Sequence, residues 1–231
     1  MANRIEVYEN IFNKNDLLAT ENREILDFEG VFSINLMASP GAGKTSLIEL
    51  TIKELSPQVN IAVIDGDIAT SIDTDRARAA GAQAYQINTG GECHLDANMI
   101  SEALTKIDLS SVDLLIVENV GNLICPASFK LGTHHNVLVA SIPEGDDKPY
   151  KYPVMYRGID ALVINKIDLL PYVEFDLDFF RRGVEVLSPG LETFLLSCRT
   201  LEGVNLCISW IRKFVGNRMN DVSYSRAPLS R

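Results

Sequence analysis

The sequence has few of the features that mark exported, membrane-bound or nucleic-acid-binding proteins. No apolar run approaches the roughly 20 residues that cross a bilayer, and the start, MANRIEVYEN, has no apolar segment typical of a signal peptide. The formal net charge is -10, and Lys and Arg form no clusters, which argues against binding to nucleic acid or to anionic membranes. We therefore predict a soluble cytoplasmic protein with no nucleic-acid or membrane partner.

The sequence also has little cysteine and histidine. Four cysteines in 231 residues lack the density of a small disulfide-stabilised domain, so we expect reduced thiols that remain available for metal binding or catalysis. Two of the three histidines, His134 and His135, precede an apolar run, and we predict structural or exposed positions for them. The third, His94, directly follows Cys93.

Short apolar runs alternate with helix-length segments from Val31 onward. Continuous apolar strands separated in this way are typical of a mainly parallel sheet with helices on both faces. A hydrophobic content of 46% is enough for one sizeable core, so we predict a single α/β domain over residues 31–216. The runs are VFSINLMA, VNIAVIDG, VDLLIVEN, NVLVASIP, DALVINK and TFLLS.

The two ends of the chain differ from this central domain. Over residues 1–30, Leu17, Leu18, Ile25 and Phe28 recur at roughly helical spacing, which predicts an N-terminal amphipathic helix that ends at Gly30. At the other end, residues 217–231 follow a helix predicted to end near residue 215 and have few apolar anchors. We predict a flexible tail there.

The segment ASPGAGKTS, residues 38–46, follows an apolar run and opens a predicted helix, as a phosphate-binding P-loop does. Backbone N–H groups at the helix start can bind phosphate, Lys44 can reach the β- and γ-oxygens, and the Thr45 hydroxyl can ligate Mg²⁺. Ala38 replaces the first glycine of the pattern, which an ordinary β conformation tolerates. The alternative is a glycine turn that binds nothing. The predicted nucleotide contacts are Pro40, Gly41, Ala42, Gly43, Lys44, Thr45 and Ser46.

A second motif, NKID at residues 165–168, resembles the guanine motif N-K-x-D of P-loop GTPases. The carboxylate of Asp168 can accept hydrogen bonds from N1 and N2 of guanine, whereas adenine would leave that charge unpaired. The alternative is an Asx turn, which is common for a lone pattern of this kind. The predicted base contacts are Asn165, Lys166 and Asp168, together with Ser197 and Cys198 of LLSCRT.

Acidic residues follow the second apolar run, in IDGDIATSIDTDRARAAG. Asp65, Asp67, Asp73 and Asp75 can supply one or two ligands to Mg²⁺, directly or through water. The alternative is a solvated acidic loop, which we favour for Asp75.

The segment VENVGN, after the next apolar run, resembles the D-x-x-G switch of GTPases. Glu118 replaces the usual aspartate, and the N–H of Gly121 would sense the γ-phosphate. The P-loop and these acids together supply the groups that we predict for nucleotide hydrolysis and for binding of Mg²⁺. The predicted catalytic residues are Lys44, Thr45, Asp73 and Glu118, and the predicted magnesium ligands are Thr45, Asp67, Asp73 and Glu118.

Three residues in loops next to these elements could bind a softer metal. Cys93 and His94 lie between the acidic segment and the next helix, and Cys125 follows the switch glycine by four residues. Thiolate and imidazole suit Zn²⁺ or Ni²⁺, and a water or a second protomer could supply the ligand that tetrahedral zinc lacks. Spacing alone favours ordinary buried cysteines, which is also our interpretation of Cys198 and Cys207.

Five long stretches together resemble the HypB family, the GTPases of hydrogenase nickel insertion. They occur in the family's order over residues 3–215: MASPGAGKTSL, VIDGDIATSIDTDRARAAGAQAYQINTGGECHLDA, VENVGNLICPASFKLG, IPEGDDKPYKYP and INKIDLLPY.

The resemblance implies a SIMIBI-class P-loop GTPase that hydrolyses GTP with Mg²⁺ and forms a homodimer favoured by GTP. It implies a nickel or zinc site at the dimer interface, formed by Cys93, His94 and Cys125. It also implies two partners, a nickel chaperone and the hydrogenase large subunit. Some members carry an N-terminal C-x-x-C-G-C motif and a histidine-rich stretch. Neither occurs here, so we expect no nickel storage.

Other functions remain open at this point. A urease-type accessory GTPase is expected to carry Cys-Pro-His, but Cys93 and His94 are adjacent here. A GTPase of cobalamin enzymes is a further alternative, as is a metal-binding chaperone in which GTP hydrolysis only controls dimerisation. An ATP-dependent ligase would have no use for NKID. Lys148 and Lys151 either add positive charge near the nucleotide or lie in a solvated loop.

Overall fold

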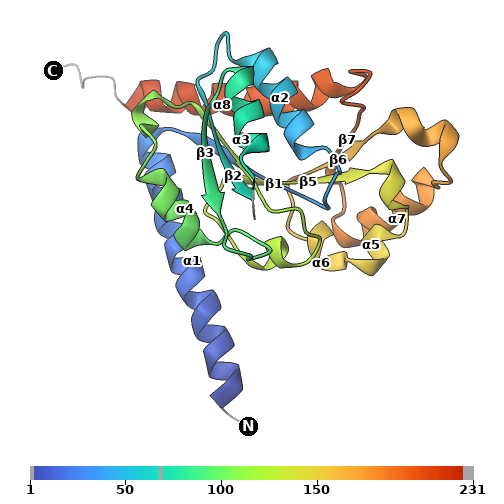
Figure 1. Ribbon diagram of the computed structural model, residues 1–231, viewed down its shortest axis with the longest axis horizontal. Helices are drawn as coiled ribbons and strands as arrows, with labels where there is room; N and C mark the ends of the chain where they lie inside the picture. The colour runs from blue at the N-terminus through green and yellow to red at the C-terminus, as the bar shows by residue number, and fades with distance from the viewer. Residues whose placement is uncertain (1–2, 68–69, 226–231) are drawn as a thin grey trace.

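The structure, a computed structural model, describes residues 3–67 and 70–225, and its centre is a seven-stranded sheet in the order β3-β2-β4-β1-β5-β6-β7 (Figure 1). Every pair of neighbouring strands is parallel, which confirms the predicted sheet. The strands are β1 (Phe32–Ala38), β2 (Ile61–Asp67), β3 (Gln83–Asn88), β4 (Leu114–Glu118), β5 (His135–Ser141), β6 (Ala161–Asn165) and β7 (Glu192–Leu195).

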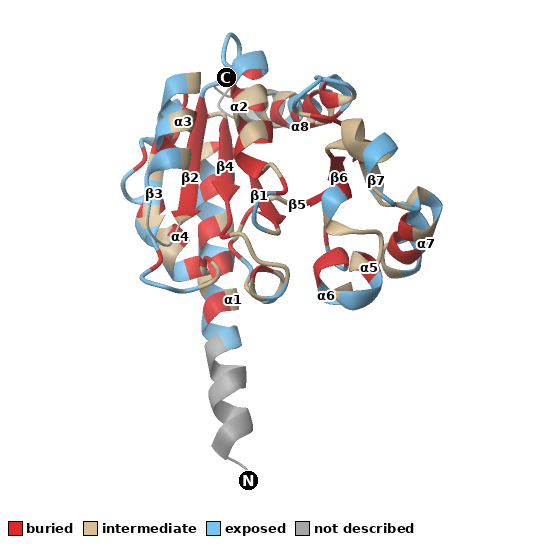
Figure 2. Ribbon diagram, turned by 45° about the vertical axis from the view of Figure 1, so that its right-hand side comes forward, coloured by how far each residue is buried: buried red, intermediate tan, exposed pale blue. Residues whose placement is uncertain are grey.

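Helices cover both faces of this sheet, so the central strands are apolar on both sides. Leu114 and Ile116 of β4 face the cluster that contains α2 and α8, whereas Leu115 and Val117 face the cluster that contains α1 and α4. Figure 2 shows these strands buried between the helices. The helices are α1 (Asn3–Glu29), α2 (Lys44–Leu55), α3 (Ile72–Ala80), α4 (Ala97–Leu104), α5 (Lys148–Lys151), α6 (Pro153–Tyr156), α7 (Leu177–Leu187) and α8 (Val204–Ser225).

Helix α1 ends at Gly30 as predicted, but it docks by a different face. Leu17 and Phe28 are 67% and 83% exposed, whereas Asn22 and Leu26 are fully buried. The Asn22 amide donates to the carbonyls of Ala97 (2.8 Å) and Leu131 (3.1 Å). Asparagine therefore helps to dock this helix through hydrogen bonds, and the prediction from apolar spacing named the wrong face because asparagines interrupt the apolar residues of the buried face.

Helix α8 continues to Ser225, so residues 217–225 are helical where we predicted a tail. Glycine within a helix costs only about 1 kcal/mol, so Gly216 does not end it. Arg218 pairs with Asp27 at the end of α1 and helps to hold this extension against the domain. The rest of the predicted tail, residues 226–231, lies outside the described residues, and the division at residues 30 and 216 stays a prediction. Within the part of the chain described here, no helix is both long and apolar enough to cross a membrane.

His134 occupies a structural position at the end of the sheet opposite to the P-loop. Its Nδ1 accepts a hydrogen bond from the N–H of Ser33 (3.0 Å), and its Nε2 lies 3.0 Å from Asp27. Nδ1 therefore cannot carry a proton, and burial lowers the pKa of His134 to about 4. His135 packs against Phe214 and Trp210. Both environments fit the structural role that we predicted.

Candidate nucleotide and metal site

The P-loop connects the carboxyl end of β1 to the start of α2 at Lys44. Ala38 pairs with Val139 as an ordinary β residue, which explains why it can replace the glycine of the pattern. Gly43 has φ of 106°, and a side chain there would collide with the Asn165 amide. Ala42 is 1% exposed and lines neither pocket described below, although we predicted it as a contact.

A cavity of about 510 Å³ lies over this loop and collects the predicted phosphate and magnesium residues. Two cations, Lys44 and Arg76, face four acids in it. The acids are Asp65, Asp67, Asp73 and Glu118. Such an excess of carboxylates repels a triphosphate unless a divalent cation enters with it, because like charges at this range are costly in a partly buried site.

The buried acids provide an oxygen-rich site that fits Mg²⁺. Glu118 Oε1 accepts a hydrogen bond of 2.7 Å from the hydroxyl of Thr45. Burial raises the pKa of Glu118 to about 7 and that of Asp65 to about 6. A carboxylate that is costly to ionise gains most from a nearby cation, and carboxylate and hydroxyl oxygens are the protein ligands that Mg²⁺ prefers.

Asp73 and Asp75 lie in the first turn of α3 rather than in a loop. Asp73 lines the phosphate cavity, and it lies 3.4 Å from Arg76. Asp75 instead accepts from Ser71 and pairs with Arg78 on the surface, which agrees with the solvated position that we favoured.

A second cavity, of about 250 Å³, contains the predicted base contacts, and Ser46 lines both cavities. Asp168 accepts a hydrogen bond of 2.7 Å from the hydroxyl of Ser197, which fixes the carboxylate. Asn165 holds the cavity together, since its amide donates to Ala42 O (2.9 Å) and accepts from Cys198 N (3.1 Å). Lys166 Nζ donates to the carbonyl of Gly41 (2.6 Å). The two cavities thus have the arrangement of a phosphate site joined to a base site.

The predicted switch segment packs directly on the P-loop. A Cβ on Gly121 would lie 3.0 Å from Pro40 Cα, so a larger residue would have to displace the P-loop by a few tenths of an ångström. The N–H of Asn122 donates to the carbonyl of Ala38 (2.8 Å). Gly121 also lines the cavity over the P-loop.

Cys93, His94 and Cys125 come together beside this switch. Their candidate ligand atoms all lie within 4.8 Å of one another, and the two sulfur atoms are 3.0 Å apart. The contact with the Cys125 thiol is the main cause that raises the pKa of Cys93. Two thiols and an imidazole suit Zn²⁺ or Ni²⁺ and leave at least one coordination position for another ligand.

Two asparagines of the switch hold the loop that carries Cys93. Asn122 Nδ2 donates to the carbonyl of Cys93 (3.2 Å), and Asn119 Oδ1 accepts from the N–H of Leu95 (3.1 Å). Asn119 is 1% exposed, so its hydrogen bond is shielded from water. The switch therefore contacts both the phosphate cavity and the candidate metal cluster, which consists of Cys93, His94 and Cys125.

Comparisons with known proteins identify the family of this chain. The CobW/HypB/UreG nucleotide-binding domain matches residues 32–194. Hydrogenase maturation factor HypB of Rhizobium leguminosarum bv. viciae is 45% identical over 214 residues, which are 93% of this chain and 72% of that protein. This chain belongs to the HypB family. A crystal structure of HypB from Helicobacter pylori in complex with nickel has a TM-score of 0.83 and 36% identity, covering 88% of this chain and 96% of that one.

The HypB family places the chain among hydrogenase maturation factors with a nucleotide-binding domain. The signal recognition particle 54 kDa protein of Aeropyrum pernix has the same fold, with a TM-score of 0.53 over 84% of this chain and 49% of that chain. At 12% identity that likeness shows the fold alone. It agrees with the predicted fold, a mainly parallel sheet flanked by helices.

Some residues of the site were absent from our predictions. Arg76 lines the phosphate cavity, and its position one turn after Asp73 on α3 was a usable signal. Asn119 and Asn122 had no such signal, because their partners are loop backbone groups far away in the sequence. Lys148 and Lys151 pair with Asp147, and neither is among the described residues that line the two nucleotide cavities.

Proposed function

We propose that this chain is a GTP-hydrolysing metallochaperone that binds nickel or zinc and assists nickel insertion during hydrogenase maturation. One observation carries the proposal: Asn122 donates its backbone N–H to the P-loop strand at Ala38 and its side-chain amide to the loop of Cys93. A change at the nucleotide is therefore transmitted to the metal ligands over two hydrogen bonds.

Hydrolysis of GTP to GDP and phosphate would use the phosphate cavity. Lys44 and the N–H groups at the start of α2 bind the β- and γ-phosphates, and Asp73 and Glu118 orient the attacking water and the oxygen ligands around Thr45. Mg²⁺, when bound by Thr45, Asp67, Asp73 or Glu118, supplies positive charge to the phosphate oxygens. The rate then depends on positioning and charge rather than on a strong general base.

Loss of the γ-phosphate would release the N–H of Gly121 and loosen the switch. Because Asn119 and Asn122 hold the Cys93 loop, Cys93 and Cys125 would then change their separation, and the metal affinity would change with it. Two protomers with GTP bound would complete the coordination of the metal in a cytoplasmic homodimer. The metal would pass between a nickel chaperone and the hydrogenase large subunit.

Replacing Asp168 by asparagine tests the guanine site. We expect the affinity for GTP to fall about 10- to 100-fold, because an amide presents one acceptor and one donor where guanine offers two N–H groups. Titration of nucleotide-free protein with a fluorescent GTP analogue measures this change. Asp178→Asn, an exposed aspartate in the first turn of α7, is the matched control. An Asp168→Asn protein that binds GTP as the wild type does would refute the base assignment.

A further inference from the structure

The ring of Phe129 packs against the imidazole of the candidate metal ligand His94. The two rings are stacked, with centroids 4.0 Å apart and planes inclined by 24°. Phe129 also contacts Phe12 of α1, at a centroid distance of 5.4 Å. Phe129 thus connects the metal cluster to the N-terminal helix.

The imidazole of His94 has little else to orient it. Among the described residues, its only polar side-chain contact is with Cys93 Sγ, 3.9 Å from Nδ1. Metal-binding histidines usually donate their second ring N–H to a carboxylate or a carbonyl, which fixes the ring. Because no such acceptor is found here in the described chain, the stacked ring of Phe129 is what restricts rotation of the imidazole.

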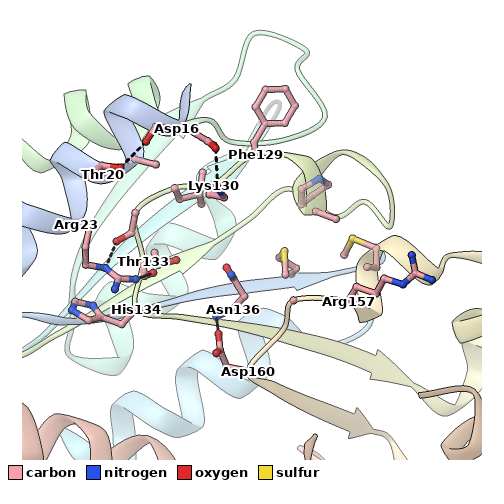
Figure 3. A pocket seen from close by; sticks show the side chains of 18 of the residues that line it. Asp16, Thr20, Arg23, Phe129, Lys130, Thr133, His134, Asn136, Arg157 and Asp160 are labelled. Atoms are coloured by element: carbon pink, nitrogen blue, oxygen red, sulfur yellow. Dashed lines mark hydrogen bonds and ion pairs between the residues drawn. The ribbon is translucent and has the colours of Figure 1, made fainter. Parts of the chain in front are cut away.

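Phe129 also belongs to the segment that carries Cys125, which lies four residues earlier. Pro126, Ala127 and Phe129 line a groove of about 670 Å³, so this segment has open space rather than a packed core on that side. Figure 3 shows Phe129 at one end of the groove beside Lys130, which forms an ion pair of 2.8 Å with Asp16 of α1. The segment is therefore held near Phe129 by α1, and before it by buried Pro126 and by Ala127, which packs against the apolar cluster that contains Met155 of α6.

We propose that Phe129 is a positioning residue of the metal site, which orients His94 and ties that ligand to the segment carrying Cys125. The proposal rests on the metal site under Proposed function. A displacement of the segment moves Cys125 and, through the stacked ring, the imidazole as well. Two ligands from separate loops then respond together to the state of the switch.

Three variants test this role through the dissociation constant for Ni²⁺, measured by competition with a chromophoric chelator. Phe129→Leu keeps an apolar side chain but removes the ring, and we expect the affinity to fall about tenfold, as for loss of a residue that orients a metal ligand. Phe129→Tyr keeps the stacked ring and is expected to bind as the wild type. Phe179→Leu is the matched control, because Phe179 is also half-buried and stacks on Tyr150 at 4.4 Å, away from the metal cluster.

A second readout needs no metal. Proton chemical shifts of the His94 ring in metal-free protein report the ring current of Phe129, so Phe129→Leu should move these signals and Phe179→Leu should not. The proposal is overturned if Phe129→Leu binds Ni²⁺ as the wild type does, or if Phe129→Tyr loses as much affinity as Phe129→Leu. Cys93→Ala separates the two proposals, because wild-type Ni²⁺ binding in that variant would refute the metal site itself.

Discussion

Replacing Lys44 by alanine is expected to lower the rate of GTP hydrolysis by about 100- to 1,000-fold. Lys44 is 8% exposed at the start of α2 and is one of two cations in a cavity with four carboxylates. Removal of a preorganised group that stabilises the charge of the transition state costs this much in other enzymes. Release of phosphate under single-turnover conditions measures the effect.

Lys53→Ala is the matched control, because Lys53 lies in the last turn of the same helix and is exposed. Its rate should equal that of the wild type. The same pair of variants separates two functions in cells that depend on this chain for hydrogenase maturation. Maturation that survives Lys44→Ala would contradict a role for hydrolysis and favour a metal-binding chaperone.

Replacing Cys93 by alanine is expected to reduce the affinity for Ni²⁺ and Zn²⁺ more than 100-fold. Loss of a residue that only orients a metal ligand costs about 10- to 100-fold in affinity, and Cys93 is itself a candidate ligand. Cys93 touches both other candidate ligands, with sulfur atoms 3.0 Å apart and His94 Nδ1 at 3.9 Å. His94 and Cys125 alone leave half of a tetrahedral set unfilled. Metal analysis of purified protein, followed by competition titration, measures the loss.

Cys207→Ala serves as the control for thiol loss. Cys207 is 2% exposed in the core cluster of α8, and burial raises its pKa to about 12, so it holds its proton at neutral pH. Its removal should leave the metal stoichiometry unchanged. Unchanged stoichiometry in Cys93→Ala would instead show that the metal binds elsewhere.

The sheet and the nucleotide motifs could be predicted because their signals are local. A strand such as β4 is buried on both faces, so its apolar run identifies it without knowledge of its neighbours. Gly43, Lys44 and Thr45 occur together in a P-loop because the turn, the charge and the helix start must be adjacent in the chain. The NKID motif is similarly local, and its Asp168 accepts a hydrogen bond from the hydroxyl of Ser197.

The parts that were missed depend on contacts between distant segments. Asn22 docks α1 onto backbone carbonyls 75 and 109 residues away, and a polar residue gives no hydrophobic periodicity. Asn122 and Phe129 likewise act on loops that only the fold brings near. Helix α8 was predicted too short because Gly216 and the polar residues after it resemble a helix end. In the structure, Arg218 on this extension forms an ion pair with Asp27 of α1.

The measurement that tests the account most directly is the affinity for Ni²⁺ of the same protein with GDP bound and with a non-hydrolysable GTP analogue bound. The phosphate cavity and the Cys93 loop share the segment that contains Asn119 and Asn122, so the two dissociation constants should differ by about fivefold or more. Replacing Asn122 by alanine should reduce that ratio. Equal affinities for Ni²⁺ in the two nucleotide states of the wild type would contradict the coupling. They would mean that the bound nucleotide does not shift the equilibrium between the two states of the switch.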